Sequence, residues 1–305
     1  MTTLERPTRH WSHSRLELYA RCPLAYRFRY VDRAPGKPSA AATRGKQVHE
    51  FAEAYARACH AAGRATDYDA ARVLLAGYDD PDVREIGARF IETTQFDWSL
   101  IVADGNSIER EFAVLLPDDL GLFRGRVDLV QWNEFEGALV VTDYKSGWSW
   151  CRPDECPPQL RCYAWAMKQV FPAATSVQAI YRYLGNDRTY DWTLYDPQPD
   201  WAVAMARRVI ADDAYEPTPS PHACAWCDYG HLCPLVQEDP LTCPTCPEDA
   251  ARTLAQVTAT EARADELRAC LRRWTHEHGE VVGAGKRAWE APPVWHLRGD
   301  EYQLR

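Results

Sequence analysis

Charged residues interrupt apolar segments at positions where a buried charge is costly. The segment "GALVVTDYKSG" ends in Asp143 and Lys145, and the upstream segment "GRVDLV" contains Asp128. Side chains alternate between the two faces of a strand, so Asp143 and Lys145 point the same way and Tyr144 points the other way. A hairpin through "NEFEG" would place Asp128 beside Asp143.

Two neighbouring carboxylates repel each other unless they are protonated, hydrogen-bonded or bound to a metal. A divalent cation with oxygen ligands resolves that repulsion, and Lys145 would then neutralise charge or orient a water molecule. Such a set can hold a cation against a phosphodiester, which is the chemistry of a nuclease. The same residues also fit an ordinary exposed ion pair at a strand end.

Apolar periodicity predicts the elements that would position these groups. Helical spacing runs through "TRGKQVHEFAEAYARACHAAGR", ended by Gly63, and continues over residues 66–99 with a break at "YDDPD". The period changes to two in "SIEREFAVLL", "LFRGRVDLVQW" and "GALVVTDYKS", which predict an antiparallel meander. A helix at 157–171, two strands joined by "GND" and a helix at 198–214 follow. This order predicts a mixed α/β (α+β) core.

Composition indicates a globular chain. It has 305 residues, 46% of them hydrophobic, without an apolar run long enough to span a membrane or the apolar region of a signal peptide near its start. We therefore expect a cytoplasmic protein with no membrane contact. The net charge of −9 argues against broad attachment to a polyanion. No GxxxxGK(S/T) loop is present, so we expect no nucleotide cofactor.

Several segments resemble, in the same order, the motifs of one nuclease family. "GRVDLV" followed by "VVTDYKSG" resembles the active-site hairpin of the PD-(D/E)xK nuclease superfamily, in its RecB-like or AddB-like exonuclease branch, and is similar to CRISPR-associated RecB-like exonucleases. "GKQVHEF" resembles the helical motif that contributes a metal-binding histidine, here His49. "QLRCY" resembles the QxxxY motif, with Gln159 and Tyr163 on one helix face. With the cysteine segments "ARCPLAYRFRYV" and "CAWCDYGHLC", the resemblance covers residues 12–235.

The resemblance implies a restriction-endonuclease-like core, a mixed sheet flanked by helices, with a metal-dependent active site. Lys145 would be the catalytic lysine, and Gln159 and Tyr163 would contact the substrate. The implied ligands of Mg²⁺ or Mn²⁺ are His49, Asp128, Asp143 and the backbone carbonyl of Tyr144. Asp143 stands where the motif more often has Glu. Glu109 and Glu111 are expected to face solvent, as edge-strand glutamates usually do, although either would add a carboxylate near the metal.

The eleven cysteines favour metal binding over disulfides in a reducing compartment. Spacing alone fits a zinc (Zn²⁺) ribbon built from two CxxC pairs, which are Cys224, Cys227, Cys243 and Cys246. The family resemblance instead implies a 4Fe-4S cluster with the ligands Cys22, Cys224, Cys227 and Cys233. Such a cluster would join distant parts of the chain, and we favour it.

We expect residues 1–235 to form a RecB-like nuclease domain closed by the cysteine cluster. Residues 236–305 would form a cysteine-containing linker, a helix at 248–278 and a small β-hairpin around "GAGKR". The predicted function is a metal-dependent DNA exonuclease acting on single-stranded ends in recombination, repair or phage-type DNA processing. The alternative is a non-catalytic DNA-binding iron–sulfur or zinc module of a recombination or CRISPR-adaptation complex. Any unwinding would require a helicase or recombination partner protein.

Overall fold

A computed structural model of the chain contains two compact units. The first comprises Met1–Ala20 and Pro38–Ala214, and the second comprises Arg21–Lys37 and Tyr215–Arg305. The residues that the structure describes are 9–37, 40–147, 154–220, 223–224, 227–237, 247–278, 281–283, 286–289, 296–299 and 302–303. Among these residues, no helix has both the length and the apolar character needed to cross a bilayer.

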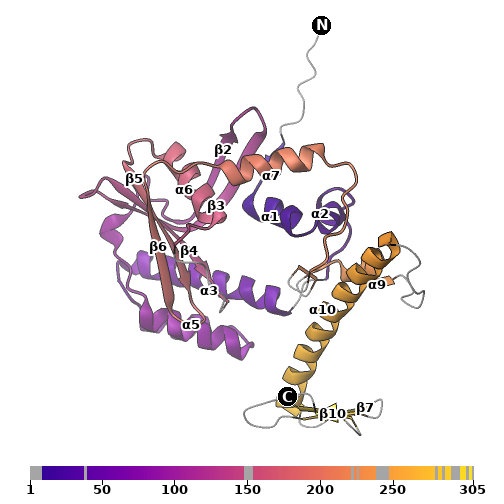
Figure 1. Ribbon diagram of the computed structural model, residues 1–305. Coiled ribbons are helices and arrows are strands. Elements are labelled where there is room, and N and C mark those ends of the chain that lie inside the picture. The colour runs from indigo at the N-terminus through magenta and orange to yellow at the C-terminus, as the bar shows by residue number, and fades with distance from the viewer. Residues whose placement is uncertain are drawn as a thin grey trace. The chain divides into compact units, whose positions relative to one another are not determined.

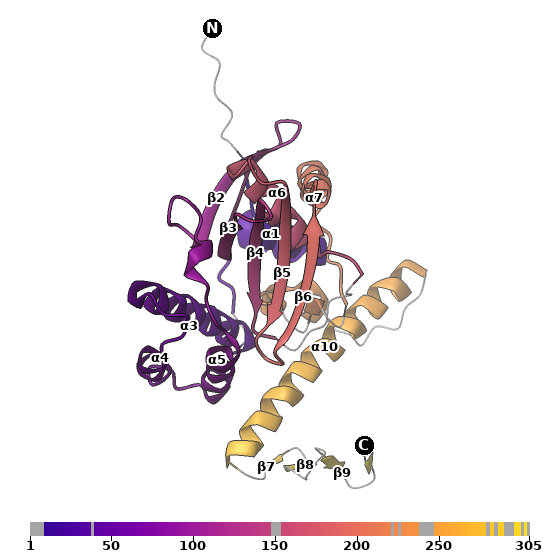
Figure 2. The same ribbon diagram turned by 90° about the vertical axis from the view of Figure 1, so that its left-hand side faces the viewer.

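The first unit is a mixed sheet flanked by helices (Figures 1 and 2). Its strands are β1 His10–Trp11, β2 Ile108–Leu116, β3 Gly121–Asn133, β4 Ala138–Lys145, β5 Ser176–Tyr183 and β6 Arg188–Leu194. Its helices are α1 His13–Arg21, α3 Ala40–Ala62, α4 Tyr68–Leu75, α5 Pro81–Thr93, the 3₁₀ helix η1 Trp98–Leu100, α6 Pro158–Val170 and α7 Asp200–Ala211.

The sheet has the order β1-β3-β4-β5-β6, and β2 also pairs with β3. Strands β2, β3 and β4 are antiparallel neighbours, so the predicted meander is confirmed. Strand β5 pairs parallel with β4 and antiparallel with β6. A parallel pair needs a crossover connection, and α6 lies in that connection. The predicted mixed α/β class is confirmed, and the architecture agrees with a restriction-endonuclease-like fold.

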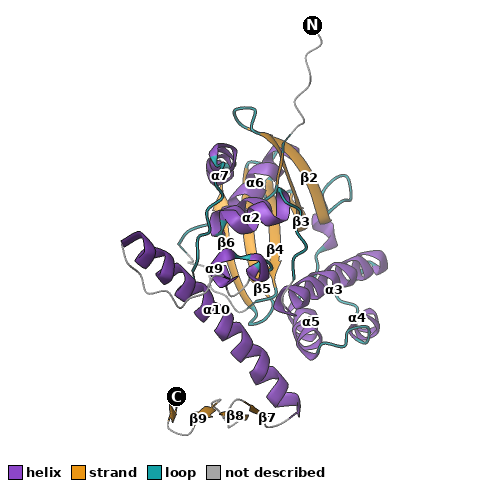
Figure 3. Cartoon of the chain, turned by 90° about the vertical axis from the view of Figure 1, so that its right-hand side faces the viewer, coloured by secondary structure: helices purple, strands orange, loops and turns teal. Residues whose placement is uncertain are grey.

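Capping residues explain where the helices of the first unit begin and end. Gly63 follows α3 with a φ of +62°, as the sequence predicts for a residue that ends a helix. Asp67 and Asp80 precede α4 and α5, and their carboxylates accept hydrogen bonds from backbone N–H groups of the first turn. These caps break the predicted helical region at 66–99 into separate helices, which lie together with α3 (Figure 3).

The two faces of β4 carry different chemistry because its side chains alternate. Tyr144 is buried in an apolar core with residues of α3 and α5, and its ring meets that of Phe90 edge-on at 5.0 Å between centroids. Asp143 instead accepts a hydrogen bond from Gln159 of α6. The strand therefore separates a packed core from a polar edge that faces α6.

The second unit has its own helices and sheet. Its elements are α2 Pro23–Tyr30, η2 Gly230–Leu232, α9 Pro234–Gln237, α10 Pro247–His278, β7 Val281–Gly283, β8 Lys286–Trp289, β9 His296–Gly299 and β10 Tyr302–Gln303. Helix α10 matches the predicted helix at 248–278. Strands β7 and β8 form the expected hairpin, but β9 and β10 extend it into a four-stranded sheet. Strands of two to four residues are too short to show an alternation of apolar and polar residues in the sequence. The boundary at residue 235 stays a prediction.

Candidate active site

Asp128 and Asp143 lie at the point where β3 and β4 stop pairing. The last pair on this side is Leu129 with Thr142, so the two aspartates are the next residues along their strands and share a face. The backbone N–H of Tyr144 donates a hydrogen bond of 2.6 Å to Asp128 Oδ2. The strand pairing therefore brings the two predicted carboxylates together.

Asp143 is nearly inaccessible, with a side chain that is 5% exposed. Its Oδ1 accepts a hydrogen bond of 2.9 Å from Gln159 Nε2. Its Oδ2 pairs with the Lys145 ammonium at 2.7 Å. Burial raises the pKa of Asp143; the charge of Lys145 opposes this shift, and the charge of Asp128 adds to it. Both oxygens of this buried carboxylate therefore have a partner, and the partner of Oδ2 is a cation.

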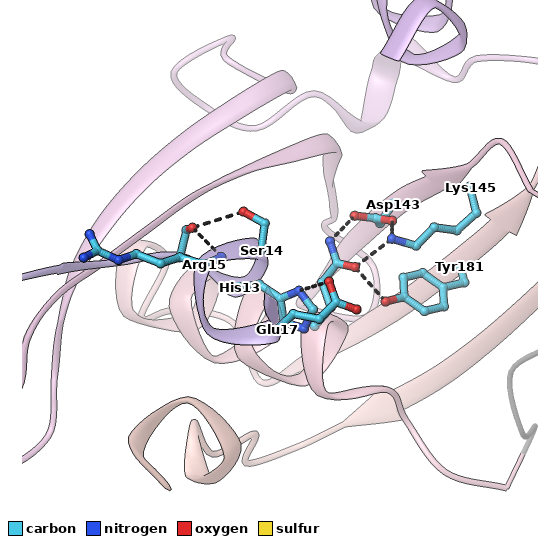
Figure 4. Close-up of polar contacts among 9 residues, drawn as sticks. His13, Ser14, Arg15, Glu17, Asp143, Lys145 and Tyr181 are labelled. Carbon is cyan, nitrogen blue, oxygen red and sulfur yellow. Dashed lines mark hydrogen bonds and ion pairs between the residues drawn. The ribbon is translucent and has the colours of Figure 1, made fainter. Parts of the chain in front are cut away.

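Lys145 is held in place by its neighbours (Figure 4). Its Nζ donates a hydrogen bond of 2.7 Å to Gln159 Oε1 and lies 4.6 Å from the ring centroid of Tyr181. The Tyr181 hydroxyl donates to the same Gln159 oxygen at 2.9 Å. Tyr181 is paired with Asp143 across β4 and β5, so the parallel register positions it. Charge, hydrogen bonding and cation–π contact together fix the ammonium group beside Asp143.

Gln159 and Tyr163 share one face of α6, as their spacing predicts. The Tyr163 side chain hydrogen-bonds to Gln159, and its ring packs edge-on against Phe112 at 5.5 Å. Gly125 leaves room for this contact, because a Cβ there would lie 2.5 Å from the Phe112 ring. The structure places Gln159 between the aspartate and the lysine, while its contact with substrate stays a prediction.

His49 projects from α3 toward Asp128, with its Nδ1 3.5 Å from Asp128 Oδ2. Burial lowers the pKa of His49, but the hydrogen bond and the charge of Asp128 outweigh that effect and the net shift is upward. A metal ion that bound this imidazole would have to displace its proton. His49 therefore lies where the resemblance places it, within reach of one predicted carboxylate.

Glu109 also belongs to this group, and the expectation that it faces solvent is wrong. The β2–β3 pairs on either side of it place it across from Asp128, and its side chain is 7% exposed beside Arg126. Burial, followed by the charge of Asp128, raises the pKa of Glu109 to about 7. Its φ of +51° is uncommon for a residue other than glycine. Glu111 is exposed, as expected.

We use the name acidic rim for these clustered residues, which are His49, Glu109, Asp128, Asp143 and Lys145. Within the described ranges, no three His, Cys, Asp or Glu side chains are already arranged as a metal-holding group. The carboxylates are instead engaged with the lysine, the histidine and a backbone N–H. The donor types still fit a hard divalent cation, and Asp143 Oδ2, which already pairs with the Lys145 ammonium, is a position that a metal cation could take. A cation would replace the ion pairs.

Helix α1 contributes residues that the sequence interpretation missed. His13 is 8% exposed and stacks on Trp201 of α7 at 4.9 Å between centroids. Burial, aided by the charge of Lys145, lowers the pKa of His13 to about 3, so the ring is neutral. Glu17 lies one helical turn later, and both side chains face the edge formed by Asp143 and Lys145 (Figure 4). No local pattern signals this approach, because it depends on tertiary packing.

The cysteines predicted for a cluster all lie in the second unit. Cys22 precedes α2, and Cys224, Cys227 and Cys233 lie before and after η2. Burial raises the pKa of Cys227 to about 11, and the charges of the other three thiols act in the same direction. The four thiols are therefore within electrostatic range, although they do not form a ready-made metal site. The alternative zinc ligands Cys243 and Cys246 lie outside the described residues.

Comparisons with known proteins identify a family. A model of the PD-(D/E)XK nuclease superfamily matches residues 10–234. The Gene 69 protein of Mycobacterium phage D29 is 26% identical over 283 residues, covering 78% of this chain and 100% of the relative. The Gene 69 protein of Mycobacterium phage L5 is 26% identical over 292 residues, covering 74% and 96%. These relatives' names state no activity.

A crystal structure of SSO0001 also overlaps with this chain. It has a TM-score of 0.38 and 16% identity, covering 75% of this chain and 87% of that chain. An overlap of this quality is too weak to carry a conclusion.

Proposed function

The chain belongs to the PD-(D/E)XK nuclease superfamily, and on that premise we propose that it is a metal-dependent deoxyribonuclease whose active site is the acidic rim. Members of this superfamily typically use divalent metals such as Mg²⁺. The finer proposal is a RecB-like exonuclease that degrades single-stranded DNA ends, in recombination, repair or phage-type DNA processing. A helicase or recombination protein would supply any unwinding.

The proposal rests mainly on one observation, the convergence of Asp128, Asp143 and Lys145 on a single edge of the sheet. Asp128, Asp143 and His49 would hold Mg²⁺ or Mn²⁺, with the backbone carbonyl of Tyr144 as a further ligand. A bound divalent cation would polarise the phosphate, lower the pKa of a water nucleophile and stabilise the leaving oxygen. Glu109 is an additional carboxylate at the same site.

The protein's own groups would bind and orient the phosphodiester. Lys145 is 29% exposed, so its ammonium can reach a phosphate oxygen without leaving the site. Gln159 and Tyr181 restrict the lysine to one position, which lowers the entropy cost of orienting it during the reaction. The lysine would thus neutralise phosphate charge or orient a water molecule.

A nuclease assay on end-labelled oligonucleotides tests the proposal. Single- and double-stranded DNA and RNA would be compared, each with Mn²⁺, Mg²⁺ or EDTA. We expect stepwise shortening of single-stranded DNA only when a divalent metal is present. Labels on either end would distinguish exonuclease from endonuclease products. Cleavage that is unaffected by EDTA, or no cleavage of any substrate, would argue against a metal-dependent nuclease.

The second unit would hold a 4Fe-4S cluster through Cys22, Cys224, Cys227 and Cys233. The proximity of the other thiols to Cys227 supports this ligand set, and a soft thiolate site suits iron–sulfur chemistry. Anaerobic purification followed by visible absorption and by iron and zinc analysis tests it. Cys227→Ser should lose the visible band and the iron, whereas Cys162→Ser, at a buried thiol of the first unit, should keep both. Stoichiometric zinc without iron would favour the zinc alternative.

A further inference from the structure

A pocket of about 550 Å³ adjoins the acidic rim in the first unit. Its lining includes His49, Lys145, His13, Trp201 and Tyr183. Its volume falls within the range of small-molecule sites. We call it the aromatic pocket. The pocket is open to solvent, so a ligand can enter it beside His49 and Lys145.

The aromatic lining of the pocket comes from separate elements. His13 of α1 and Trp201 of α7 are stacked at 4.9 Å with 30° between their planes. Tyr181 and Tyr183 of β5 meet edge-on at 6.1 Å. Trp201 is only half-buried, so part of its indole remains available to a ligand. Flat aromatic surfaces of this kind stack on nucleobases with little dependence on base identity.

The pocket carries charges of both signs. Lys145 supplies a positive group at the acidic rim, where an anionic phosphate would lie. Glu17 lies beside His13, with its Oε2 3.9 Å from His13 Nδ1 and its side chain 61% exposed. A carboxylate repels phosphate but accepts hydrogen bonds from the N–H groups of a base. A ligand that suits this lining has a phosphate for Lys145 and an aromatic ring with N–H donors for Trp201 and Glu17.

A nucleotide has this construction, and we propose that the aromatic pocket receives one unpaired nucleobase, that of the nucleotide whose phosphate lies at Lys145. The inference rests on the proposed nuclease function and explains a preference for single strands. A base in a duplex is paired and stacked, so it must be extruded before it can enter such a pocket. A base at a single-stranded end is already unpaired. The His13–Trp201 pair would be the stacking surface.

Binding to single-stranded oligonucleotides tests the inference separately from cleavage. The full-length chain would carry Asp143→Asn to prevent turnover, and anisotropy would report affinity in the presence of Mn²⁺. An intact oligonucleotide would be compared with ones that lack a single base at the 5′ or the 3′ terminal nucleotide. Each would be measured with Trp201→Ala, with Trp201→Phe and with Trp98→Ala. Trp98 is also half-buried but lies outside the pocket.

We expect Trp201→Ala to weaken binding of the intact oligonucleotide about 5- to 150-fold, the range for loss of one base–aromatic stack. Loss of the base at one end should weaken binding similarly, and the two changes together should cost no more than either alone. Trp201→Phe should retain most of the affinity, and Trp98→Ala all of it. A purely structural role for Trp201 would instead give equal losses on intact and base-free oligonucleotides.

The inference would be overturned if the affinity losses from Trp201→Ala and from removal of the terminal base multiplied when combined. Unchanged affinity in Trp201→Ala would also overturn it. If Trp201→Ala fails to fold, the Trp201→Phe and His13→Ala variants provide the same comparison with smaller changes. Absence of cleavage by the unmodified protein would contradict the proposed function but leave the binding result standing. Normal cleavage without any dependence on the terminal base would contradict only the inference.

Discussion

Replacing Glu109 with Gln should change how protein stability depends on pH. The Glu109 carboxyl has a pKa of about 7 in the folded chain, compared with an ordinary value of 4.5. The folded state therefore holds a proton that the unfolded state releases between these two values. The free energy of unfolding falls as pH rises through this window, and the loss persists above it. Glu109→Gln removes the titration. The free energy of unfolding of the variant, relative to that of the unmodified protein, should therefore be higher at pH 8 than at pH 4.

The size of the effect follows from the shift. A change from 4.5 to about 7, at about 1.4 kcal/mol per pH unit, corresponds to a limit of about 3 kcal/mol. The pKa of about 7 already includes the opposing charge of Arg126, which pairs with Glu109 and lowers its pKa. We therefore expect the difference in unfolding free energy between variant and unmodified protein to shift by about 1–3 kcal/mol between pH 4 and pH 8.

Urea denaturation of the metal-free protein at several pH values measures this shift. Glu111→Gln is the matched control, because Glu111 lies on the same strand but is exposed; it should show no comparable change. Added Mn²⁺ should stabilise the unmodified protein more than Glu109→Gln if the carboxylate contributes to metal binding. A variant whose relative stability is the same at pH 4 and pH 8 would refute the argument that Glu109 is buried with a raised pKa.

Other predictions concern packing, lysine position and pH. Gly125→Ala should lower the free energy of unfolding by about 1–3 kcal/mol through a clash with Phe112, whereas Gly230→Ala, in open space, should change it little in urea titrations. Tyr181→Phe should reduce kcat several-fold at unchanged KM, because loss of one hydrogen bond costs about 1 kcal/mol and loosens Lys145; an unchanged kcat would contradict a positioning role. Metal-dependent cleavage should increase with pH through the neutral range, because the raised pKa values of the rim acids and histidine keep protons on groups that must bind metal. A rate profile that falls over this range would contradict that reason.

Local patterns in the sequence account for the framework of the site. The two-residue periodicity around Asp128 and Asp143 was enough to predict antiparallel neighbours, because β2, β3 and β4 follow one another with short turns. The helix carrying His49 and the helix face shared by Gln159 and Tyr163 also follow from spacing alone. Contacts between elements that follow one another in the chain can therefore be predicted from the sequence when the connections are short.

The remaining parts depend on contacts between distant segments. Tyr181 lies beside Asp143 only because β5 crosses over and pairs parallel with β4, which no local pattern determines. His13 meets Trp201 through packing of α1 against α7. Glu109 was expected to face solvent because its segment resembles an ordinary edge strand, whereas its left-handed backbone and its register opposite Asp128 bury it.

The central claim, that the acidic rim catalyses metal-dependent DNA cleavage, is tested most directly by matched variants in one assay. Lys145→Ala and Asp143→Asn would be compared with Lys168→Ala, which changes a half-buried lysine on α6 outside the rim, whose Nζ donates to the backbone carbonyl of Tyr195. We expect Lys145→Ala and Asp143→Asn to lower the Mn²⁺-dependent rate at least 100-fold. Both variants should still be folded, as shown by a cooperative unfolding transition, and Lys168→Ala should retain full activity. Undiminished cleavage by both rim variants would contradict the account.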